Sequence, residues 1–299
     1  MKLLLYWDYF QSYHIDRARS VYATNQDIVI FSLFDTNVDS HVVTKSEFIC
    51  LGLSQHNTVR SLFNFINYLR QQKPRLVFIN GYGRSTALTA LIYCIATRTK
   101  SVLMSDSQHR DKRRNTVVEF LKSVIVKRYD YAFVSGEYAR KYLIQLGIPP
   151  ARILIGYNAV DNNFFKQRQT GQKDNYLLCV SRFIEKKNIV NLIKWFCRYR
   201  ATYPLSGLSL KIVGQGPLQE RITKTVCEHG GESFVSVNSY KDKSELADLY
   251  AKARIFILPS HTNEQWGLVV NEAMAAGCPV LVSNVCGCAP DLVEEGVNG

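Results

Sequence analysis

The sequence lacks the long apolar runs that mark membrane-spanning or secreted proteins. The uncharged stretch from Ser85 to Thr97 falls short of the ~20 apolar residues that a spanning helix requires. Near the start, the apolar run from Leu3 to Trp7 is too short for the hydrophobic region of a signal peptide and is ended by Asp8. We therefore expect a cytoplasmic protein.

The sequence also lacks closely paired cysteines. None of its eight cysteines belongs to a Cys-x-x-Cys pair, and several lie inside apolar runs. Cys286-Gly-Cys288 has no ligating His or second cysteine pair nearby in the sequence, which weakens a metal-site interpretation. Scattered cysteines favour buried thiols in a reducing compartment over a disulfide framework. They are Cys50, Cys94, Cys179, Cys197, Cys227, Cys278, Cys286 and Cys288.

Acidic residues are scarce relative to basic ones. The chain has 25 Asp and Glu against 37 Lys and Arg, a formal net charge of +12. This balance indicates an anionic partner, which could be phosphates, nucleic acid or an acidic membrane surface, and it does not choose among them. With 46% hydrophobic and 21% charged residues, the 299-residue chain has the composition of a folded globular protein and the length of two ordinary domains.

Short β-branched runs alternate with amphipathic stretches along most of the chain. Most of these runs are continuously apolar, as expected of strands that are covered on both faces of a parallel sheet. Repeated strand–helix–strand units predict a doubly wound α/β architecture. The candidate strands are Arg75–Asn80, Ser101–Ser105, Tyr131–Ser135, Arg152–Tyr157, Tyr176–Ser181, Leu208–Gly214, Arg254–Leu258 and Pro279–Ser283.

Helical patterns separate these strands. Apolar residues recur on one helical face from Val59 to Leu69 and again from Ile189 to Phe196. Pro217 is suited to open a helix that Gly230 closes. Ser244 is suited to cap a helix that reaches Tyr250.

The polar segment Lys166–Asp174 contains no apolar residue and is the best candidate linker. It predicts an N-terminal domain over residues 1–168 and a C-terminal domain over residues 169–299. Because ligands of doubly wound sheets bind at the carboxyl ends of the strands, we expect the site in a cleft between the two halves. The chain ends in a turn signal with no closing helix after it, which indicates a C-terminal truncation.

The strongest motif is Glu264-Gln-Trp-Gly-Leu-Val-Val-Asn-Glu272-Ala-Met-Ala-Ala-Gly-Cys-Pro-Val. It predicts a polar loop after a strand, then a helix that opens near Gly267 and ends at Gly277. A glycine at a helix mouth lets backbone amides approach a phosphate, and the helix N-terminus favours its charge. Glu264 precedes this mouth. Glu272 lies more than one turn inside, where its carboxylate can accept hydrogen bonds from sugar or ribose hydroxyls.

This string resembles the family 4 retaining glycosyltransferases, whose hallmark is two Glu separated by seven residues in a Glu-x-aromatic-Gly…Glu-Ala-Met-Ala-x-Gly-x-Pro-Val context. The bare spacing of Glu264 and Glu272 is common by chance, whereas the full string is specific. The resemblance covers the chain well from about Tyr129 onward. It implies an α/β fold of two facing Rossmann-like domains, the GT-B type, with a nucleotide-sugar donor site in the C-terminal domain.

The segment from Val180 to Asn188 places two cations after a strand. Cations five residues apart in such a loop can converge on a diphosphate. The family has its phosphate-binding Arg and Lys at this spacing, which implies that role for Arg182 and Lys187. Lys186 would then be the solvated neighbour. Asn188 stands where the family more usually has Gly.

Two further segments resemble donor-binding parts of the family. Gly214-Gln-Gly216-Pro217 resembles its Gly-x-Gly-Pro turn beside the donor nucleotide, although a plain tight turn has the same pattern. Ser239-Tyr240 matches the stretch that often holds the base through backbone groups. The resemblance thus implies donor contacts at Arg182, Lys187, Gly214, Gly216, Ser239, Tyr240, Glu264, Gly267, Leu268, Val269 and Glu272.

The N-terminal half departs from the family pattern. Asp8-Tyr-Phe-Gln-Ser follows the first strand in place of a glycine-rich loop. Asp106 lies where the family commonly has a His facing the donor sugar, and His109 is displaced by three residues. Either side chain can face the sugar, and a surface role for His109 is an equal alternative. Gly81-Tyr-Gly-Arg84-Ser85 either lines the acceptor side or forms an ordinary turn.

The implied reaction transfers a glycosyl group from a nucleoside-diphosphate sugar to a hydroxyl acceptor with retention, in polysaccharide or glycolipid biosynthesis. Arg182, Lys187 and the amides near Gly267 would stabilise the departing diphosphate. Glu264 would hold the sugar ring and Glu272 the ribose. The sequence contains no Asp-x-Asp, the usual metal-binding motif of the other large glycosyltransferase fold. We therefore expect neither a metal nor a cofactor apart from the donor co-substrate.

Basic residues gather in the middle of the N-terminal half. In a predicted amphipathic helix over Val117–Arg128, they interleave with Leu121 and Ile125. Such a face can rest on anionic headgroups, which would make the protein peripheral at the inner face of a membrane with a saccharide or lipid-linked acceptor. A solvated helix face is the alternative. The residues are Arg110, Lys112, Arg113, Arg114, Lys122, Lys127, Arg128, Arg140 and Lys141.

Other functions fit parts of the same pattern. A sugar-nucleotide epimerase of similar fold would act on the donor without an acceptor. A nucleic-acid-binding module would use the positive charge, but no recognisable binding motif accompanies it. A non-catalytic relative that only binds an anionic ligand is also compatible with the departures in the N-terminal half.

Overall fold

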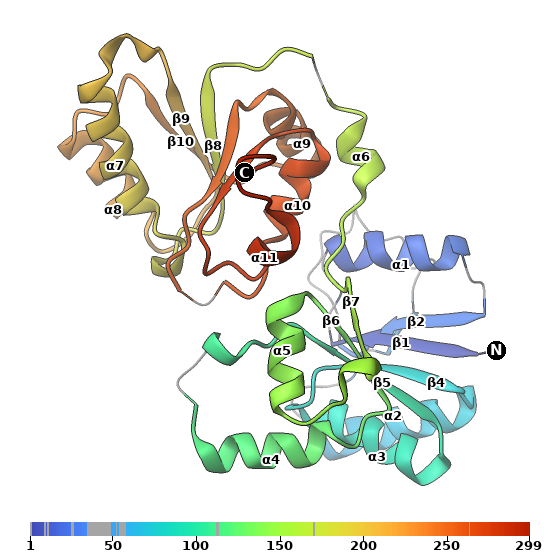
Figure 1. Ribbon diagram of the computed structural model, residues 1–299. Helices are drawn as coiled ribbons and strands as arrows, with labels where there is room; N and C mark the ends of the chain where they lie inside the picture. The colour runs from blue at the N-terminus through green and yellow to red at the C-terminus, as the bar shows by residue number, and fades with distance from the viewer. Residues whose placement is uncertain are drawn as a thin grey trace. The chain divides into compact units, whose positions relative to one another are not determined.

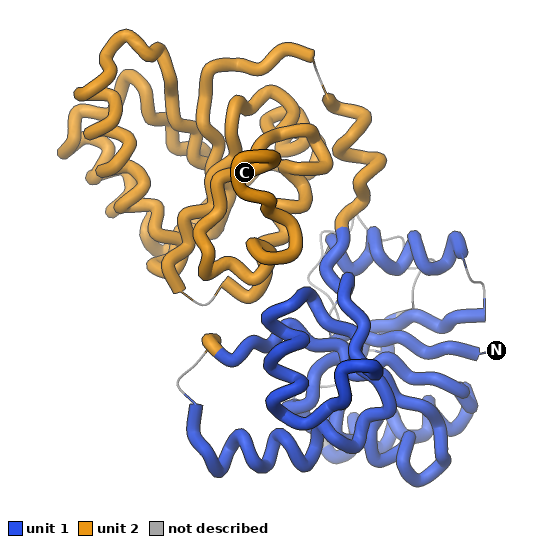
Figure 2. Tube along the Cα trace, in the orientation of Figure 1, with its two compact units in different colours: residues 1–109, 113–159 blue, residues 110–112, 160–299 orange. Residues whose placement is uncertain are grey.

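The computed structural model describes residues 2–8, 10, 12–24, 27–34, 49–51, 53, 58–111, 114–169, 171–262 and 264–299. The chain folds into two compact units (Figure 2). Unit 1 takes the described residues of 1–109 and 113–159, and unit 2 those of 110–112 and 160–299. Lys112 and Arg113 of the basic cluster, and Tyr9 and Gln11 after the first strand, lie outside the described residues.

Unit 1 is built on a parallel sheet with the order β3-β2-β1-β4-β5-β6-β7 (Figure 1). Its strands are β1 (Leu3–Trp7), β2 (Ile28–Ser32), β3 (Ile49–Cys50), β4 (Leu76–Asn80), β5 (Lys100–Ser105), β6 (Tyr131–Val134) and β7 (Ile153–Ile155). Its α-helices are α1 (Ser12–Thr24), α2 (Thr58–Gln72), α3 (Ser85–Thr97), α4 (Thr116–Val126) and α5 (Glu137–Gln145).

Unit 2 repeats the architecture on a parallel sheet with the order β10-β9-β8-β11-β12. Its strands are β8 (Tyr176–Val180), β9 (Ser209–Val213), β10 (Val235–Asn238), β11 (Ile255–Leu258) and β12 (Val280–Val282). Its α-helices are α6 (Asn162–Lys166), α7 (Ile189–Thr202), α8 (Gln219–Glu228), α9 (Lys243–Lys252), α10 (Leu268–Ala275) and α11 (Ala289–Leu292). Figure 1 shows α7 and α8 on one side of this sheet and α9 and α10 on the other.

Alternate residues of β8 explain why this sheet is buried on both faces. Successive strand residues point to opposite faces. Tyr176, Leu178 and Val180 pack in the core that α9 and α10 cover. Leu177 and Cys179 pack in the core that α7 and α8 cover. A strand that buries both faces must be apolar throughout, and this is the pattern that predicted it.

The unit boundary differs from the one drawn from composition. The two units divide at Ala159 and Val160, nine residues before the boundary predicted between residues 168 and 169. The reason is α6, which begins after Asp161 and whose Phe165 is buried in the core of unit 2. The polar segment therefore begins inside α6, an element of unit 2.

One predicted helix start is wrong. The N-cap of α9 is Asp242, not Ser244, because the Asp242 carboxylate accepts a hydrogen bond from the Glu245 amide at 2.8 Å. The Glu245 carboxylate in turn accepts from the Asp242 amide at 3.2 Å, which completes a capping box. The Ser244 hydroxyl instead accepts from the Arg168 guanidinium at 2.9 Å.

Within the described residues, no helix has the length and apolar character required to cross a bilayer.

Candidate functional site

Donor-site candidates of unit 2 follow the carboxyl ends of four neighbouring strands. Arg182 and Lys187 follow β8, and Glu264 follows β11. The strand order β10-β9-β8-β11-β12 makes the gap between β8 and β11 the point where the connections turn to opposite sides. In doubly wound sheets this switch point is the usual ligand site. The loops that carry Lys187 and Glu264 both start there.

Lys187 and Glu264 form an ion pair at this switch point. The Lys187 ammonium contacts Oε2 of Glu264, and the two side chains are only 11% and 9% exposed. The buried Ser260 hydroxyl donates to the same oxygen at 3.0 Å. A buried carboxylate needs both a partner charge and hydrogen bonds, and Glu264 has both. The sequence predicted each residue for the site but not their pairing.

Lys186 is not merely the solvated neighbour that the spacing suggested. Its ammonium lies 3.9 Å from Oε1 of Glu264, and its side chain is 30% exposed. The segment carrying both lysines is fixed from the β11 side, because His261 donates its amide to the Lys186 carbonyl at 3.0 Å. Glu264 therefore faces two ammonium groups, with Lys187 the more buried of them.

The loops after β8 and β9 are bound to each other at close range. Phe183 donates its amide to the Gln215 carbonyl at 2.9 Å and accepts from the Leu218 amide at 3.1 Å. A Cβ on Gly214 would lie 1.9 Å from the Ser181 carbonyl oxygen, and one on Gly216 would lie 2.6 Å from that of Phe183. The two glycines are therefore required by this loop packing. Arg182 is exposed in the same loop.

Gly267 opens α10 in a conformation that other residues rarely adopt. Its φ is 105°, and a Cβ there would lie 2.7 Å from a side-chain methyl of Leu258. No side chain caps the start of α10. The backbone amides of its first residues, Leu268 and Val269, therefore have no side-chain acceptor at the helix N-terminus. This is the local geometry that the sequence motif predicted for a phosphate-binding helix mouth.

Glu272 lies one turn further along α10. One of its carboxylate oxygens accepts a hydrogen bond from the Tyr250 hydroxyl at 2.9 Å. Tyr250 is fully buried, and burial together with the neighbouring Glu272 charge raises the pKa of its hydroxyl well above the usual value. The hydroxyl thus stays protonated and donates to Glu272.

Ser239 and Tyr240 follow the edge strand β10 and are both exposed. Tyr240 keeps 66% of its surface accessible. Their nearest strand neighbour is β9, whose end carries Gly214, and the Gly214 amide donates to the Asn238 carbonyl at 3.0 Å. The residues predicted to contact the nucleotide after β9 and after β10 therefore lie next to each other.

Sequence reasoning missed the residues that hold the two carboxylates. Ser260 was given no role, and Tyr250 was named only as the end of a predicted helix. The segment 283–288 was given no role in the donor site. Its Gly287 amide donates to the Glu264 carbonyl at 2.9 Å, and its Cys288 amide donates to the Trp266 carbonyl at 3.2 Å. No local pattern marks such contacts, because they join parts of the chain about 20 residues apart.

Asp106 and His109 belong to unit 1, where they contact different residues. Asp106 follows β5 and accepts a hydrogen bond from the Asn158 amide group at 3.2 Å. Asn158 accepts from the Arg17 guanidinium at 2.8 Å. The His109 ring lies beside that of Tyr142, with 6.2 Å between centroids. Asp106 is thus part of a polar chain, whereas His109 is exposed on a short 3₁₀ turn.

Arg84 is part of a polar cluster at the switch point of unit 1. There, between β1 and β4, the Arg84 guanidinium pairs with the Asp8 carboxylate at 2.9 Å. Asn80 and Thr86 also donate to that carboxylate, at 3.4 and 3.3 Å. Burial raises the pKa of Asp8, against the lowering effect of Arg84. The motif is therefore more than an ordinary turn, because it fixes a charged group at the carboxyl ends of β1 and β4, where ligands of such sheets usually bind.

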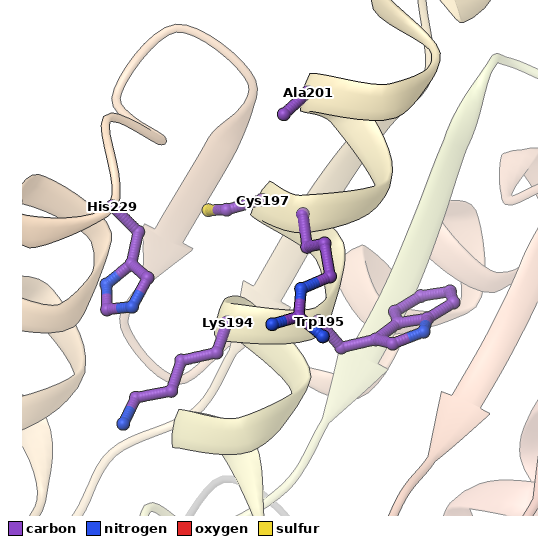
Figure 3. Close-up of a pocket in the computed structure, with 6 residues that line it drawn as sticks. Lys194, Trp195, Cys197, Ala201 and His229 are labelled. Atoms are coloured by element: carbon purple, nitrogen blue, oxygen red, sulfur yellow. The ribbon is translucent and has the colours of Figure 1, made fainter.

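A separate pocket of about 510 Å³ lies along α7 (Figure 3). Lys194 and Arg198 line it from α7, one helical turn apart, and His229 lines it from the residue after α8. None of the donor-site candidates lines this pocket. The candidate site is therefore defined by the strand ends of unit 2 and not by this cavity.

Comparison with known proteins assigns a family likeness to unit 2. Residues 160–299 match the family model "Glycosyl transferases group 1". A glycogen synthase of Mycobacterium tuberculosis is 35% identical over 123 residues, which are 41% of this chain and 28% of that protein. A GDP-mannose-dependent alpha-(1-6)-phosphatidylinositol monomannoside mannosyltransferase of the same species is 30% identical over 189 residues, 61% of this chain and 47% of that protein. The matched regions are thus less than half of these relatives.

Solved structures share the architecture of the whole chain. The Anabaena protein HepE in complex with UDP superposes with a TM-score of 0.74 at 17% identity, over 100% of this chain and 85% of that one. A glycosyltransferase of Rickettsia africae gives a TM-score of 0.75 at 12% identity, over 98% and 82% of the chains. The predicted fold class, two Rossmann-like α/β domains of the GT-B glycosyltransferase type, is confirmed.

Proposed function

We propose that the protein is a retaining glycosyltransferase that moves a sugar from a nucleoside-diphosphate sugar to a hydroxyl acceptor. The observation that supports it best is the Lys187–Glu264 pair at the switch point of unit 2. This pair lies within the residues that match the glycosyl transferases group 1 model. Its relatives include a glycogen synthase and a mannosyltransferase that acts on a phosphatidylinositol monomannoside. We therefore propose a role in polysaccharide or glycolipid biosynthesis.

The proposed roles follow from chemistry and position. Lys187 and the exposed Arg182 stabilise the negative charge that develops on the departing diphosphate, together with the amides at the start of α10. Glu264 accepts hydrogen bonds from hydroxyls of the transferred sugar. Glu272 accepts them from the ribose, and the backbone near Ser239 and Tyr240 holds the base. Asp106 of unit 1 is the proposed partner on the far side of the sugar, and His109 the alternative.

A panel of sugar nucleotides tests this proposal. A donor at saturating concentration should stabilise the fold by roughly 2–4 kcal/mol in a thermal-shift measurement. The donor found in this way is then incubated with candidate hydroxyl acceptors, and release of nucleoside diphosphate and the anomeric configuration of the product are measured. Conversion of the sugar nucleotide without any acceptor would instead identify an epimerase. Inversion at the anomeric carbon would disprove the retaining assignment.

We also propose that donor binding needs no divalent metal. Cationic side chains and a helix terminus can neutralise a diphosphate in place of Mg²⁺ or Mn²⁺. The affinity for the donor nucleotide, measured by calorimetry, should then be the same with and without EDTA. A large loss of affinity on chelation, restored by added Mg²⁺, would contradict the proposal.

A peripheral membrane location is favoured by α4, although its exposed face is mainly apolar and not the basic face that the sequence suggested. Lys122 is turned inward, where its ammonium contacts Glu119 at 2.7 Å and the Tyr142 hydroxyl at 3.2 Å. The exposed side of α4 is apolar instead: Val117, Val118, Phe120, Leu121 and Val124 are each between 44% and 68% exposed. Two exposed cations, Lys127 and Arg128, directly follow this apolar face in the sequence. We propose that it rests on an anionic bilayer.

A further inference from the structure

Tyr250 places its hydroxyl with little freedom to move. Its ring is fully buried on α9 and is flanked edge-on by Phe256 of β11, with 5.5 Å between ring centroids, and by Phe165 of α6, with 6.1 Å. The hydroxyl donates to Glu272 of α10 at 2.9 Å. Because three elements fix the ring, the hydrogen bond fixes the carboxylate.

This arrangement gives Glu272 one preferred orientation. Glu272 is half-buried in the second turn of α10, a helix whose residues are all buried or half-buried, and its hydrogen bond to a fixed hydroxyl reduces the number of rotamers open to its side chain. Tyr250 keeps its hydroxyl proton near neutral pH, since burial and the neighbouring Glu272 charge raise its pKa well above the usual value. The hydroxyl is therefore the donor in its hydrogen bond with the carboxylate. A carboxylate that is held in advance loses less entropy when a ligand hydroxyl binds it.

We propose that Tyr250 is a positioning residue for the ribose of the donor, and that it acts through Glu272. This inference rests on the proposed function, since it takes the ligand of Glu272 to be a ribose hydroxyl. It predicts that Tyr250 contributes to recognition of the ribose hydroxyls and to nothing else in the donor. A purely structural tyrosine would affect all nucleotides alike.

The chain offers a matched control in Tyr176. Its ring is also buried, in the same core of unit 2, and its hydroxyl donates to the Leu249 carbonyl at 2.7 Å. Tyr176→Phe removes a buried hydroxyl with one hydrogen bond, as Tyr250→Phe does, but its partner is a backbone carbonyl and not Glu272. Both variants preserve the volume of the ring, so neither leaves a large cavity.

The experiment measures the affinity of a nucleoside diphosphate and of its 2′- and 3′-deoxy analogues by calorimetry. UDP, GDP and ADP are tried first on the wild-type chain, and the tightest is used. Tyr250→Phe should weaken binding of the ribonucleotide roughly tenfold, as expected for a hydrogen bond to a charged group. It should leave the affinity of the analogue that lacks the recognised hydroxyl nearly unchanged. Tyr176→Phe should change neither affinity, and 4-aminophenylalanine at position 250, which keeps a donor, should restore ribonucleotide binding.

Four results would overturn the inference. Equal weakening of the ribonucleotide and deoxy analogues by Tyr250→Phe would show a general structural role, as would the same loss in Tyr176→Phe. A wild-type chain that binds nucleoside diphosphates without regard to the ribose hydroxyls would refute the role of Tyr250 and leave the proposed function standing. A wild-type chain that binds no nucleoside diphosphate would refute the proposed function itself. If Tyr250→Phe does not fold, the 4-aminophenylalanine variant must still prefer the ribonucleotide.

Discussion

Lys187 and Glu264 form a buried ion pair, so removing either charge should lower the stability of the fold. Each side chain is at least 89% buried, and the ion pair is completed by Ser260 and by the more distant Lys186. Removing one partner of such a pair leaves the other charge poorly compensated. In the proposed function the same ammonium also contacts the diphosphate. The donor would then bind to a lysine that Glu264 already holds in place.

Substituting the two lysines should separate their roles. Lys187→Ala should weaken binding of the nucleoside diphosphate by about 1.5–3 kcal/mol, the value for a hydrogen bond between charged groups. Lys186→Ala should weaken it far less, because its ammonium lies further from Glu264 and is more exposed. Calorimetry measures both affinities, and thermal unfolding shows whether each variant remains folded. Equal losses in the two variants would mean that Lys186 contacts the phosphates as well.

The cysteines give a residue-level test of the fold. Cys50 and Cys227 are exposed, and the other six cysteines are buried. Burial raises the pKa of Cys94 to about 12 and that of Cys179 and Cys278 to about 11. Because the thiolate is the reactive form, these buried thiols should be inert at pH 8. An aromatic disulfide reagent should therefore label two thiols quickly in the native chain and all eight after unfolding. Rapid labelling of more than two would contradict the described packing.

At the scale of elements, the sequence was most informative where a strand is buried on both faces. β8 and β11 are continuously apolar and were predicted to within two residues. β10 was not predicted, because Val-Ser-Val-Asn at the sheet edge alternates between apolar and polar residues. The start of α9 was misplaced by two residues because Asp242 and Ser244 are both good caps, and only the reciprocal bond with Glu245 decides between them.

The candidate site was predictable only in its charged and glycine residues. Arg182, Lys187, Glu264, Gly267 and Glu272 belong to compact motifs whose spacing can be read locally. The strand order that brings the loops after β8 and β11 together is not written in any local pattern. Ser260 and Tyr250 are common residue types in ordinary segments, so their contacts with the two carboxylates emerge only in three dimensions.

The helix α4 gives a prediction about membrane binding. Phe120→Glu or Leu121→Glu should abolish co-sedimentation with vesicles that contain anionic lipid, because each places a charge on the exposed apolar face. Replacing Lys127 and Arg128 with Gln should weaken binding at low salt by about 1 kcal/mol per charge and should matter less at high salt. Lys122→Gln should have no such effect, since its ammonium is paired with Glu119.

A matched control for this face is Phe63→Glu on α2. Phe63 is 60% exposed, much like Phe120 at 67%, but it lies on a different helix. Vesicle binding that survives the α4 substitutions, or that Phe63→Glu reduces equally, would show that α4 is not the membrane contact. Binding that ignores the anionic lipid would show that charge plays no part in it.

At the scale of the whole molecule, each unit has its own hydrophobic cores. The two clusters of unit 2 draw all their described buried residues from Phe165 to Cys288. The two clusters of unit 1 draw theirs from Leu4 to Tyr157. Each of these four clusters of described residues therefore lies within one unit. Each unit therefore has the main requirement for folding alone, an apolar core that its own strands and helices cover.

We therefore predict that residues 160–299, produced alone, fold and bind the donor nucleotide. Every donor-side candidate lies in this range, including Arg182, Lys187, Glu264 and Glu272 together with their partners Ser260 and Tyr250. The affinity of the fragment for nucleoside diphosphate should be within a few-fold of that of the full chain, because its contacts are made within one unit.

Transfer of the sugar to an acceptor should be lost in the fragment, because the proposed reaction also uses Asp106 of unit 1. Calorimetry on the fragment, with Lys187→Ala in the same fragment as the control, measures the first expectation, and a transfer assay measures the second. A folded fragment that binds no nucleotide, while the full chain does, would show that unit 1 supplies part of the donor site.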